Sequence, residues 1–281
     1  MKLLVVGSGT MGAGIAQVAA ENGIQVFLND TDFSRLQAAQ TGIGRLLDKK
    51  VQKGKLTEDG KKKALDNIYL ISEIKVAAKD ADFVIEAIFE NLVAKLNVFR
   101  ELEEYCKPGV IIASNTSTIS ITKMGETLKR PENFVGMHFF SPVPAMRLVE
   151  VIKGAKTSEA TVRAALELAE KLGKTPIAVS DVPGFIVNRF MCLMYNEAAQ
   201  LIQNGVATAK DIDTAMKLGA NHPMGPCEIS DMAGVDIVLN ALESLYTASG
   251  DERYKPAQLL IDMVAQGKLG LKTGEGFYNH R

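Results

Sequence analysis

The sequence predicts an α/β protein: a Rossmann-like, doubly wound, mainly parallel sheet with a second, all-α domain. Over the first 180 or so residues, short apolar runs rich in β-branched residues alternate with helical patterns. A glycine-rich turn follows the first of these runs, beginning at Gly7. After the break at Val182-Pro183-Gly184 there is no convincing strand pattern. We therefore expect two domains, residues 1–182 and 183–281.

The expected strands are short apolar runs, each bounded by turn residues or by a helical pattern. They comprise residues 3–6, 25–29, 83–87, 110–114, 134–138 and 148–152. The lysine-rich stretch from Lys49 to Lys63 interrupts this alternation, so it is expected to be a helical insertion.

The second domain begins with a strongly apolar helix. Apolar residues lie around most of the helical pattern at residues 185–202, which predicts a helix buried nearly all round. A domain of about 100 residues offers few surfaces for such burial. The pattern therefore favours a partner subunit, and we expect a homodimer formed through the C-terminal helical domain.

Composition excludes several classes of protein. A net charge of −1 gives no field that would attract nucleic acid. No signal peptide is visible and no apolar run approaches the roughly 18 residues of a membrane span, so a cytoplasmic location without membrane contact is expected. The cysteines Cys106, Cys192 and Cys227 are odd in number and widely spaced, which predicts neither a disulfide framework nor a metal site.

The first turn carries a dinucleotide-binding pattern. Gly7-Ser8-Gly9-Thr10-Met11-Gly12 lies between an apolar run and a helical pattern, where backbone N–H groups can bind a pyrophosphate. Asp30 ends the second expected strand, where a carboxylate accepts from the ribose hydroxyls of the adenosine. Its negative charge would repel a 2′-phosphate, so NAD is favoured over NADP. The alternative is a glycine turn that binds no ligand.

Further motifs extend along the whole chain, and in this order they resemble the short-chain 3-hydroxyacyl-CoA dehydrogenases, most closely the bacterial 3-hydroxybutyryl-CoA dehydrogenases. The motifs are Gly7 to Gly12, Glu86-Ala87 with Glu90 and Lys95, Ala113-Ser114-Asn115-Thr116-Ser117, Gly136-Met137-His138-Phe139-Phe140-Ser141-Pro142, Leu148-Val149-Glu150-Val151-Ile152, Pro183-Gly184-Phe185-Ile186-Val187-Asn188-Arg189, Pro223-Met224-Gly225-Pro226 and Lys272-Thr273-Gly274-Glu275-Gly276-Phe277-Tyr278.

His138 is the candidate acid-base residue. It ends an apolar run, at the edge where open α/β sheets bind ligands, and imidazole suits proton exchange with a secondary alcohol. Glu150 follows about a dozen residues later, a separation at which strand, turn and strand can bring a carboxylate to the ring and fix its tautomer. The alternatives are a core histidine and a solvated glutamate, and the resemblance favours the catalytic pair.

The resemblance implies the other site residues. Ser117, in a polar turn where a helix cap is the alternative role, binds the substrate oxygen, and Asn188 holds the acyl carbonyl. The cofactor contacts implied beyond the glycine turn and Asp30 are Glu90, Lys95, Asn115 and Ser141. Ser141 departs from the family, which usually has asparagine at this position, so a direct nicotinamide contact can be lost or replaced by water.

The substrate is expected to be an acyl-CoA. Lys49, Lys50, Lys53 and Lys55 supply cations on the helical insertion for the phosphates of CoA, and the resemblance favours Lys50 and Lys53. A solvated lysine face is the alternative. Two other functions remain open on the residues alone: a dehydrogenase of a free 3-hydroxy acid or sugar acid, and a dinucleotide-binding protein without turnover.

Overall fold

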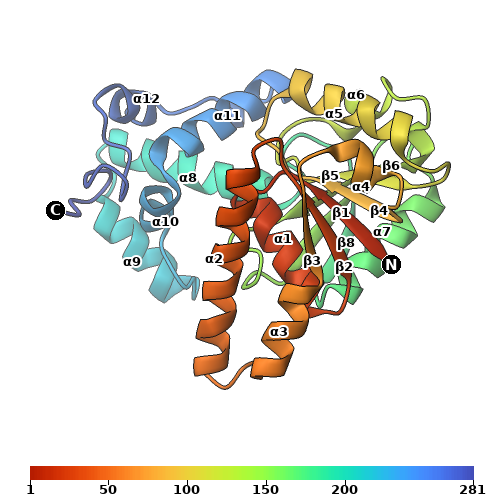
Figure 1. The fold of residues 1–281 in the computed structure, drawn as a ribbon. Helices are drawn as coiled ribbons and strands as arrows, with labels where there is room; N and C mark the ends of the chain where they lie inside the picture. The colour runs from red at the N-terminus through yellow and green to blue at the C-terminus, as the bar shows by residue number, and fades with distance from the viewer. The chain divides into compact units, whose positions relative to one another are not determined.

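An eight-stranded sheet forms the first of the two units into which the chain divides, Met1–Val182 and Pro183–Arg281. The computed structural model describes all 281 residues, and Figure 1 draws the strands as arrows. The strand order in the sheet is β3-β2-β1-β4-β5-β6-β7-β8. In chain order the strands are β1 (Lys2–Val6), β2 (Gln25–Asn29), β3 (Ile68–Ile71), β4 (Phe83–Glu86), β5 (Ile111–Ser114), β6 (Phe134–Phe139), β7 (Leu148–Lys153) and β8 (Thr175–Ser180).

The topology confirms the Rossmann-like, mainly parallel sheet. Strands β1 to β6 pair in parallel, and the strand order reverses between β1 and β4, where open α/β sheets bind their ligands. The β6–β7 pair alone is antiparallel, and β8 runs parallel to β7. Every residue of β4 is buried. Since successive side chains point to opposite faces, this requires cover on both faces of the sheet.

Helices of the first unit connect the strands. They are α1 (Thr10–Glu21), α2 (Phe33–Gln52), α3 (Glu58–Asp66), α4 (Ile74–Ala78), α5 (Leu92–Tyr105), α6 (Ile121–Gly125), the 3₁₀ turn η1 (Pro131–Asn133) and α7 (Glu159–Lys171). The expected helical insertion is present: the lysine-rich stretch ends α2 and forms most of α3, and Figure 1 shows these two helices side by side as a hairpin.

The sequence pattern did not predict two of the strands, β3 and β8, and each lies at an edge of the sheet. Only Ile68 of the four residues in β3 is buried, and β8 has no buried residue. An edge strand has one neighbour and is partly exposed to solvent, so its sequence lacks the continuous apolar run that marks a central parallel strand.

The second unit is helical. It contains α8 (Val187–Gln203), α9 (Ala209–Gly219), α10 (Pro226–Ala233), α11 (Val235–Ser249), the 3₁₀ turn η2 (Glu252–Tyr254) and α12 (Gln258–Ala265), with only isolated bridges near its end. Asp231 of α10 accepts hydrogen bonds from the backbone N–H groups of Phe277 and Tyr278, at 2.8 and 2.9 Å. The carboxylate thereby ties the C-terminal segment to α10.

The expectation that α8 is buried nearly all round is wrong for the single chain. The buried residues of this helix lie on one side: Cys192, Tyr195, Asn196, Ala198 and Ala199. Phe190 is 72% exposed. Apolar content alone therefore overestimates how much of the helix its own unit covers. No helix of the chain is long and apolar enough to cross a membrane.

Candidate active site

The glycine turn after β1 leaves no room for side chains at two of its positions. Gly7 has φ of +102°, and a Cβ built there would lie 2.6 Å from the Ala87 carbonyl oxygen. A Cβ at Gly12 would lie 1.8 Å from the Gly7 carbonyl oxygen. Glycine is required at both positions because the turn and the first turn of α1 pack directly on backbone.

Gly9, the middle glycine of the motif, has open space around it instead. A Cβ added at Gly9, the N-cap of α1, would meet no atom within 4 Å, and no side chain caps this helix end. The N–H groups of the first helical turn are therefore available to an anion. A cavity of about 800 Å³ lies here, and Gly7, Gly9, Thr10, Met11 and Asp30 are among its lining residues. The open space above Gly9 fits the pyrophosphate of a dinucleotide.

Asp30 lies where an adenosine ribose is expected, and it also ties two strand ends together. Its Oδ2 accepts from the backbone N–H and the hydroxyl of Ser8, at 3.0 and 2.8 Å. Burial raises the pKa of Asp30, but the bonds from Ser8 and Asp32 and the charge of Arg35 outweigh burial and leave the pKa below its usual value. The carboxylate stays ionised. Arg35 lines the same cavity, a cation that was not evident from the immediate neighbours of Asp30 in the sequence.

His138 and Glu150 form a hydrogen-bonded pair inside the sheet. They are directly opposite in the antiparallel β6–β7 register, and the His138 Nδ1 lies 2.8 Å from the Glu150 Oε2. The side chains are 6% and 0% exposed. The Phe140 ring lies 4.5 Å from the imidazole, centroid to centroid. A carboxylate acceptor at Nδ1 favours the tautomer with a proton there, which leaves proton exchange to Nε2.

Ser117 lies in the turn that follows β5. Its backbone N–H donates to Glu90 Oε1 at 3.0 Å. Because β5 and β6 run in parallel, Ser117 and His138 both lie toward the carboxyl edge of the sheet. Asn115 joins the two strand ends, since its Oδ1 accepts from the backbone N–H of Phe139 at 2.9 Å. The fold thus brings Ser117, Asn115 and His138 to one edge.

The remaining cofactor candidates do not line the 800 Å³ cavity. Glu90, Lys95, Asn115 and Ser141 are all absent from its lining. Lysine is ordinarily a surface residue, but the side chain of Lys95 is 1% exposed, and its Nζ lies 2.6 Å from Glu86 Oε1. The fold tolerates a buried ammonium here because a carboxylate inside the protein pairs with its charge.

The two lysines expected to bind phosphate differ in their surroundings. Lys50 Nζ lies 2.5 Å from Glu21 Oε2, so its charge is already paired. Lys53 is exposed at the C-cap of α2. A second cavity, of about 660 Å³, lies between the first turn of α1, the length of α2 and the segment after β6. Its lining includes Lys49 of the predicted lysine cluster and two cations that were not predicted, Arg35 and Arg45.

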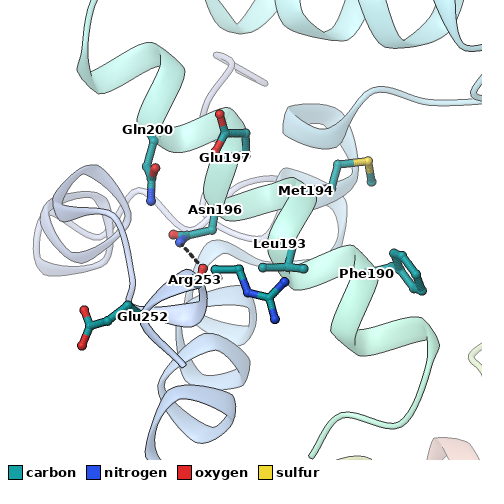
Figure 2. A pocket seen from close by; sticks show the side chains of 8 residues that line it. All are labelled: Phe190, Leu193, Met194, Asn196, Glu197, Gln200, Glu252 and Arg253. Atoms are coloured by element: carbon teal, nitrogen blue, oxygen red, sulfur yellow. Dashed lines mark hydrogen bonds between the residues drawn. The ribbon is translucent and has the colours of Figure 1, made fainter. Parts of the chain in front are cut away.

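In the second unit, Asn188 is the second residue of α8. The same helix borders a cavity of about 670 Å³, whose lining Figure 2 shows: Phe190, Leu193, Met194, Asn196, Glu197 and Gln200 come from α8, and Glu252 and Arg253 from η2. Asn196 Nδ2 donates to the Arg253 carbonyl oxygen at 3.2 Å, which joins the two segments (Figure 2).

No group of three or more His, Cys, Asp or Glu side chains is arranged to hold a metal ion. The three cysteines are buried and unpaired, and burial raises the pKa of Cys106 and of Cys192 to about 11. The dinucleotide cradle and the histidine–glutamate pair, both on one Rossmann-type sheet, define the class: an NAD-dependent oxidoreductase.

Comparison with known proteins gives the family. The NAD binding domain of 3-hydroxyacyl-CoA dehydrogenase matches residues 2–182, and the C-terminal domain of that enzyme matches residues 184–280. The chain is 47% identical over 280 residues to a probable 3-hydroxybutyryl-CoA dehydrogenase of Deinococcus radiodurans, with 100% of both chains covered. It is 44% identical to a 3-hydroxybutyryl-CoA dehydrogenase of Clostridioides difficile, over 100% of this chain and 99% of that protein.

A solved structure agrees with these relatives. The crystal structure of (S)-3-hydroxybutyryl-CoA dehydrogenase from Ralstonia eutropha has a TM-score of 0.97 and 44% sequence identity, and the match covers 100% of this chain and 99% of that chain. The chain belongs to the 3-hydroxyacyl-CoA dehydrogenase family.

Proposed function

We propose that this enzyme interconverts (S)-3-hydroxybutyryl-CoA and acetoacetyl-CoA with NAD, and that His138 exchanges the hydroxyl proton. The observation that carries the proposal is the buried His138–Glu150 pair at the carboxyl edge of the sheet that also forms the dinucleotide cradle. The names of the relatives support the substrate: each acts on 3-hydroxybutyryl-CoA.

Each residue of the pair has one task. NAD, when bound, supplies the hydride acceptor. In the oxidation direction the hydroxyl proton passes to the imidazole of His138, and the imidazolium lies against the carboxylate of Glu150, which stabilises its charge. In reduction the same imidazolium returns the proton to the oxygen. Ser117 would donate to this oxygen, and Asn188 would donate to the thioester carbonyl.

The CoA part of the substrate requires cations. Arg35, Arg45 and Lys49 line one cavity along α2, and Lys53 lies exposed at the end of this helix. Phosphate groups of CoA bind at such a cluster through charge and hydrogen bonds. We assign this role to Lys49 and Lys53, together with the two arginines, in preference to Lys50, whose ammonium is paired with Glu21.

The test compares two substrates that differ only in the thioester. NADH oxidation is followed by absorbance with acetoacetyl-CoA and then with free acetoacetate. We expect turnover with the first and at most a trace with the second. Equal turnover would instead indicate a dehydrogenase of free 3-hydroxy acids, and no turnover with either would indicate a dinucleotide-binding protein.

The role of the α2 cations is tested with a shorter substrate. The double variant Lys49→Met with Lys53→Met should raise KM for acetoacetyl-CoA about three- to tenfold, given the modest strength of exposed charge contacts. KM for a truncated acetoacetyl thioester without the nucleotide should hardly change. An equal rise for both substrates would contradict the assignment.

The enzyme is further proposed to be a cytoplasmic homodimer formed through the helical unit. Unpaired cysteines suit a reducing compartment. The exposed Phe190, with Leu193 and Met194 beside it on α8, supplies an apolar surface of the kind that subunit contacts bury (Figure 2). Light scattering should give twice the chain mass of 30.3 kDa, and Phe190→Glu should shift this mass toward the monomer. A monomeric mass for the unaltered chain would refute the dimer.

A further inference from the structure

A buried charge network lies beside the proposed active site, and the proposed chemistry does not use it. Lys95 of α5 points its Nζ at Glu86 Oε1, 2.6 Å away, and at Glu90 Oε2, 3.3 Å away. The side chains of Lys95 and Glu86 are 1% and 0% exposed. Two buried charges that cost much desolvation energy need a full set of hydrogen bonds, so the partners of this network are informative.

Glu86 connects the ends of two neighbouring strands. Its Oε2 accepts from the Ser114 hydroxyl at 2.7 Å, and its Oε1 accepts from the Ile88 backbone N–H at 2.7 Å. Ser114 is the residue directly beside Glu86 in the parallel β4–β5 register. The carboxylate therefore fixes the point at which the chain leaves β5 and enters the turn that carries Ser117.

Glu90 holds this turn from the other side. A single oxygen, Oε1, accepts from the Thr116 hydroxyl at 2.5 Å, the Ser117 backbone N–H at 3.0 Å, the Thr118 backbone N–H at 3.1 Å and the Thr118 hydroxyl at 3.0 Å. Burial raises the pKa of Glu90, but the Lys95 charge and these bonds outweigh burial and keep the pKa below its usual value. The Glu90 carboxylate is thus ionised, and it accepts hydrogen bonds from the three consecutive residues Thr116, Ser117 and Thr118.

We propose that Glu90 is a positioning residue for Ser117, and that the buried Glu86–Lys95 pair holds Glu90 in place. The proposal rests on the function proposed above for Ser117. It adds a structural role to the cofactor contact that the resemblance implies for Glu90 and Lys95. A hydroxyl placed about 1 Å wrongly can cost on the order of 100-fold in rate.

The decisive variant is Glu90→Gln. Glutamine can present its carbonyl oxygen to the Ser117 turn, but its amide NH₂ then faces the Lys95 ammonium, donor against donor. In the opposite orientation the glutamine NH₂ faces the N–H and hydroxyl donors of the turn. Either arrangement loses one side of the network, so we expect kcat with acetoacetyl-CoA to fall about tenfold, a loss of the size expected for imperfect positioning. The dissociation constant for NADH is measured by fluorescence, and kcat is read at saturating NADH, so that weaker cofactor binding does not enter the loss of kcat.

A double-mutant cycle separates positioning from a general structural effect. Ser117→Ala is combined with Glu90→Gln, and kcat is measured for the four proteins. If Glu90 acts through Ser117, Glu90→Gln should cost less than about twofold in the Ser117→Ala background. The matched control is Glu104→Gln, an exposed glutamate on the same helix, which should leave kcat and NADH binding unchanged.

Each other outcome overturns a distinct statement. Additive losses in the cycle would overturn the positioning role while leaving the function of Ser117 intact. Normal turnover by Ser117→Ala would overturn the proposed role of Ser117 and the positioning role with it. If Glu90→Gln does not fold, Thr118→Val removes only one hydroxyl donor to Glu90. It should lower kcat about two- to threefold, and in the Ser117→Ala background it should have no effect.

Discussion

Two buried pairs of ionisable side chains involve strands of the same sheet, and they differ in the chemistry of the basic group. His138 faces Glu150 at 2.8 Å across β6 and β7, and Lys95 faces Glu86 at 2.6 Å between α5 and β4. Imidazole ordinarily titrates near pH 6.5, whereas a lysine ammonium holds its proton to about pH 10.4. An imidazole is therefore suited to exchange a proton with a substrate hydroxyl, whereas a lysine is suited to serve as a fixed cation.

This difference predicts a separation of roles. A pair whose cation can become neutral tolerates the loss of its anion, because no buried charge has to remain. A pair of two permanent charges leaves one of them buried and uncompensated whenever the other is removed. The histidine pair is therefore suited to chemistry and the lysine pair to holding structure, and variants of each should fail in different measurements.

The largest effect is expected on turnover, from His138→Gln. Glutamine can still donate to Glu150, but it cannot take up a proton, so general acid-base catalysis is lost. We expect kcat with acetoacetyl-CoA to fall about 1000-fold, within the range for removal of such a group. NADH binding should stay intact, since the glycine turn and Asp30, which bind the pyrophosphate and the adenosine ribose, are unchanged. His222→Gln serves as the control, and near-normal rates for His138→Gln would refute the catalytic role.

The next effect is expected on stability, from Lys95→Met. Methionine fills the volume of the lysine stem but leaves Glu86 as a buried carboxylate without its cation, at a cost of about 3–5 kcal/mol in the free energy of unfolding. Urea unfolding followed by circular dichroism should show a lower midpoint. The control is Lys153→Met, whose ion pair with Glu159 is exposed and should contribute little to the free energy of unfolding.

A second variant makes the stability prediction more specific. If the damage comes from the uncompensated charge, adding Glu86→Gln to Lys95→Met should recover part of the lost stability, because the remaining side chain is then neutral. An unchanged or lower midpoint in the double variant would indicate that lost packing, rather than charge, accounts for the effect.

The two pairs also differ in how far the sequence could predict them. Strand, turn and strand over a dozen residues is a local pattern, and it correctly suggests that Glu150 can reach His138. The partners of Lys95 depend on the crossover from β4 into α5, which sets a helix face against a strand end. The burial of Lys95 could not be predicted, because nothing in a single sequence tells which polar side chain of an amphipathic helix turns inward.

The same reasoning explains the successes and failures in the fold. Central strands carry continuous apolar runs, which predicted the parallel sheet. The glycine pattern after the first run predicted the cofactor site. The edge strands β3 and β8 carry weaker patterns and were missed. Arg35, Arg45 and Lys49 all lie on α2 and line one cavity, but the sequence does not show that this face of the helix borders the start of α1. A sequence specifies local chemistry well, but convergence of distant side chains is a property of packing.

The smallest of these effects, and the one that best separates the two pairs, is expected from Glu150→Gln. The imidazole loses the carboxylate that fixes its tautomer and stabilises its charged form, so kcat should fall about 100-fold, less than for His138→Gln because the base itself remains. The free energy of unfolding should fall by only about 1 kcal/mol, the loss of one hydrogen bond, since a neutral imidazole can remain buried.

The comparison with Lys95→Met should therefore invert: Glu150→Gln loses more turnover and Lys95→Met loses more stability. Measuring both quantities for both variants tests the division of roles directly. If Glu150→Gln were as unstable as Lys95→Met, the histidine would have to be held permanently charged, and its part in proton exchange would need a different account.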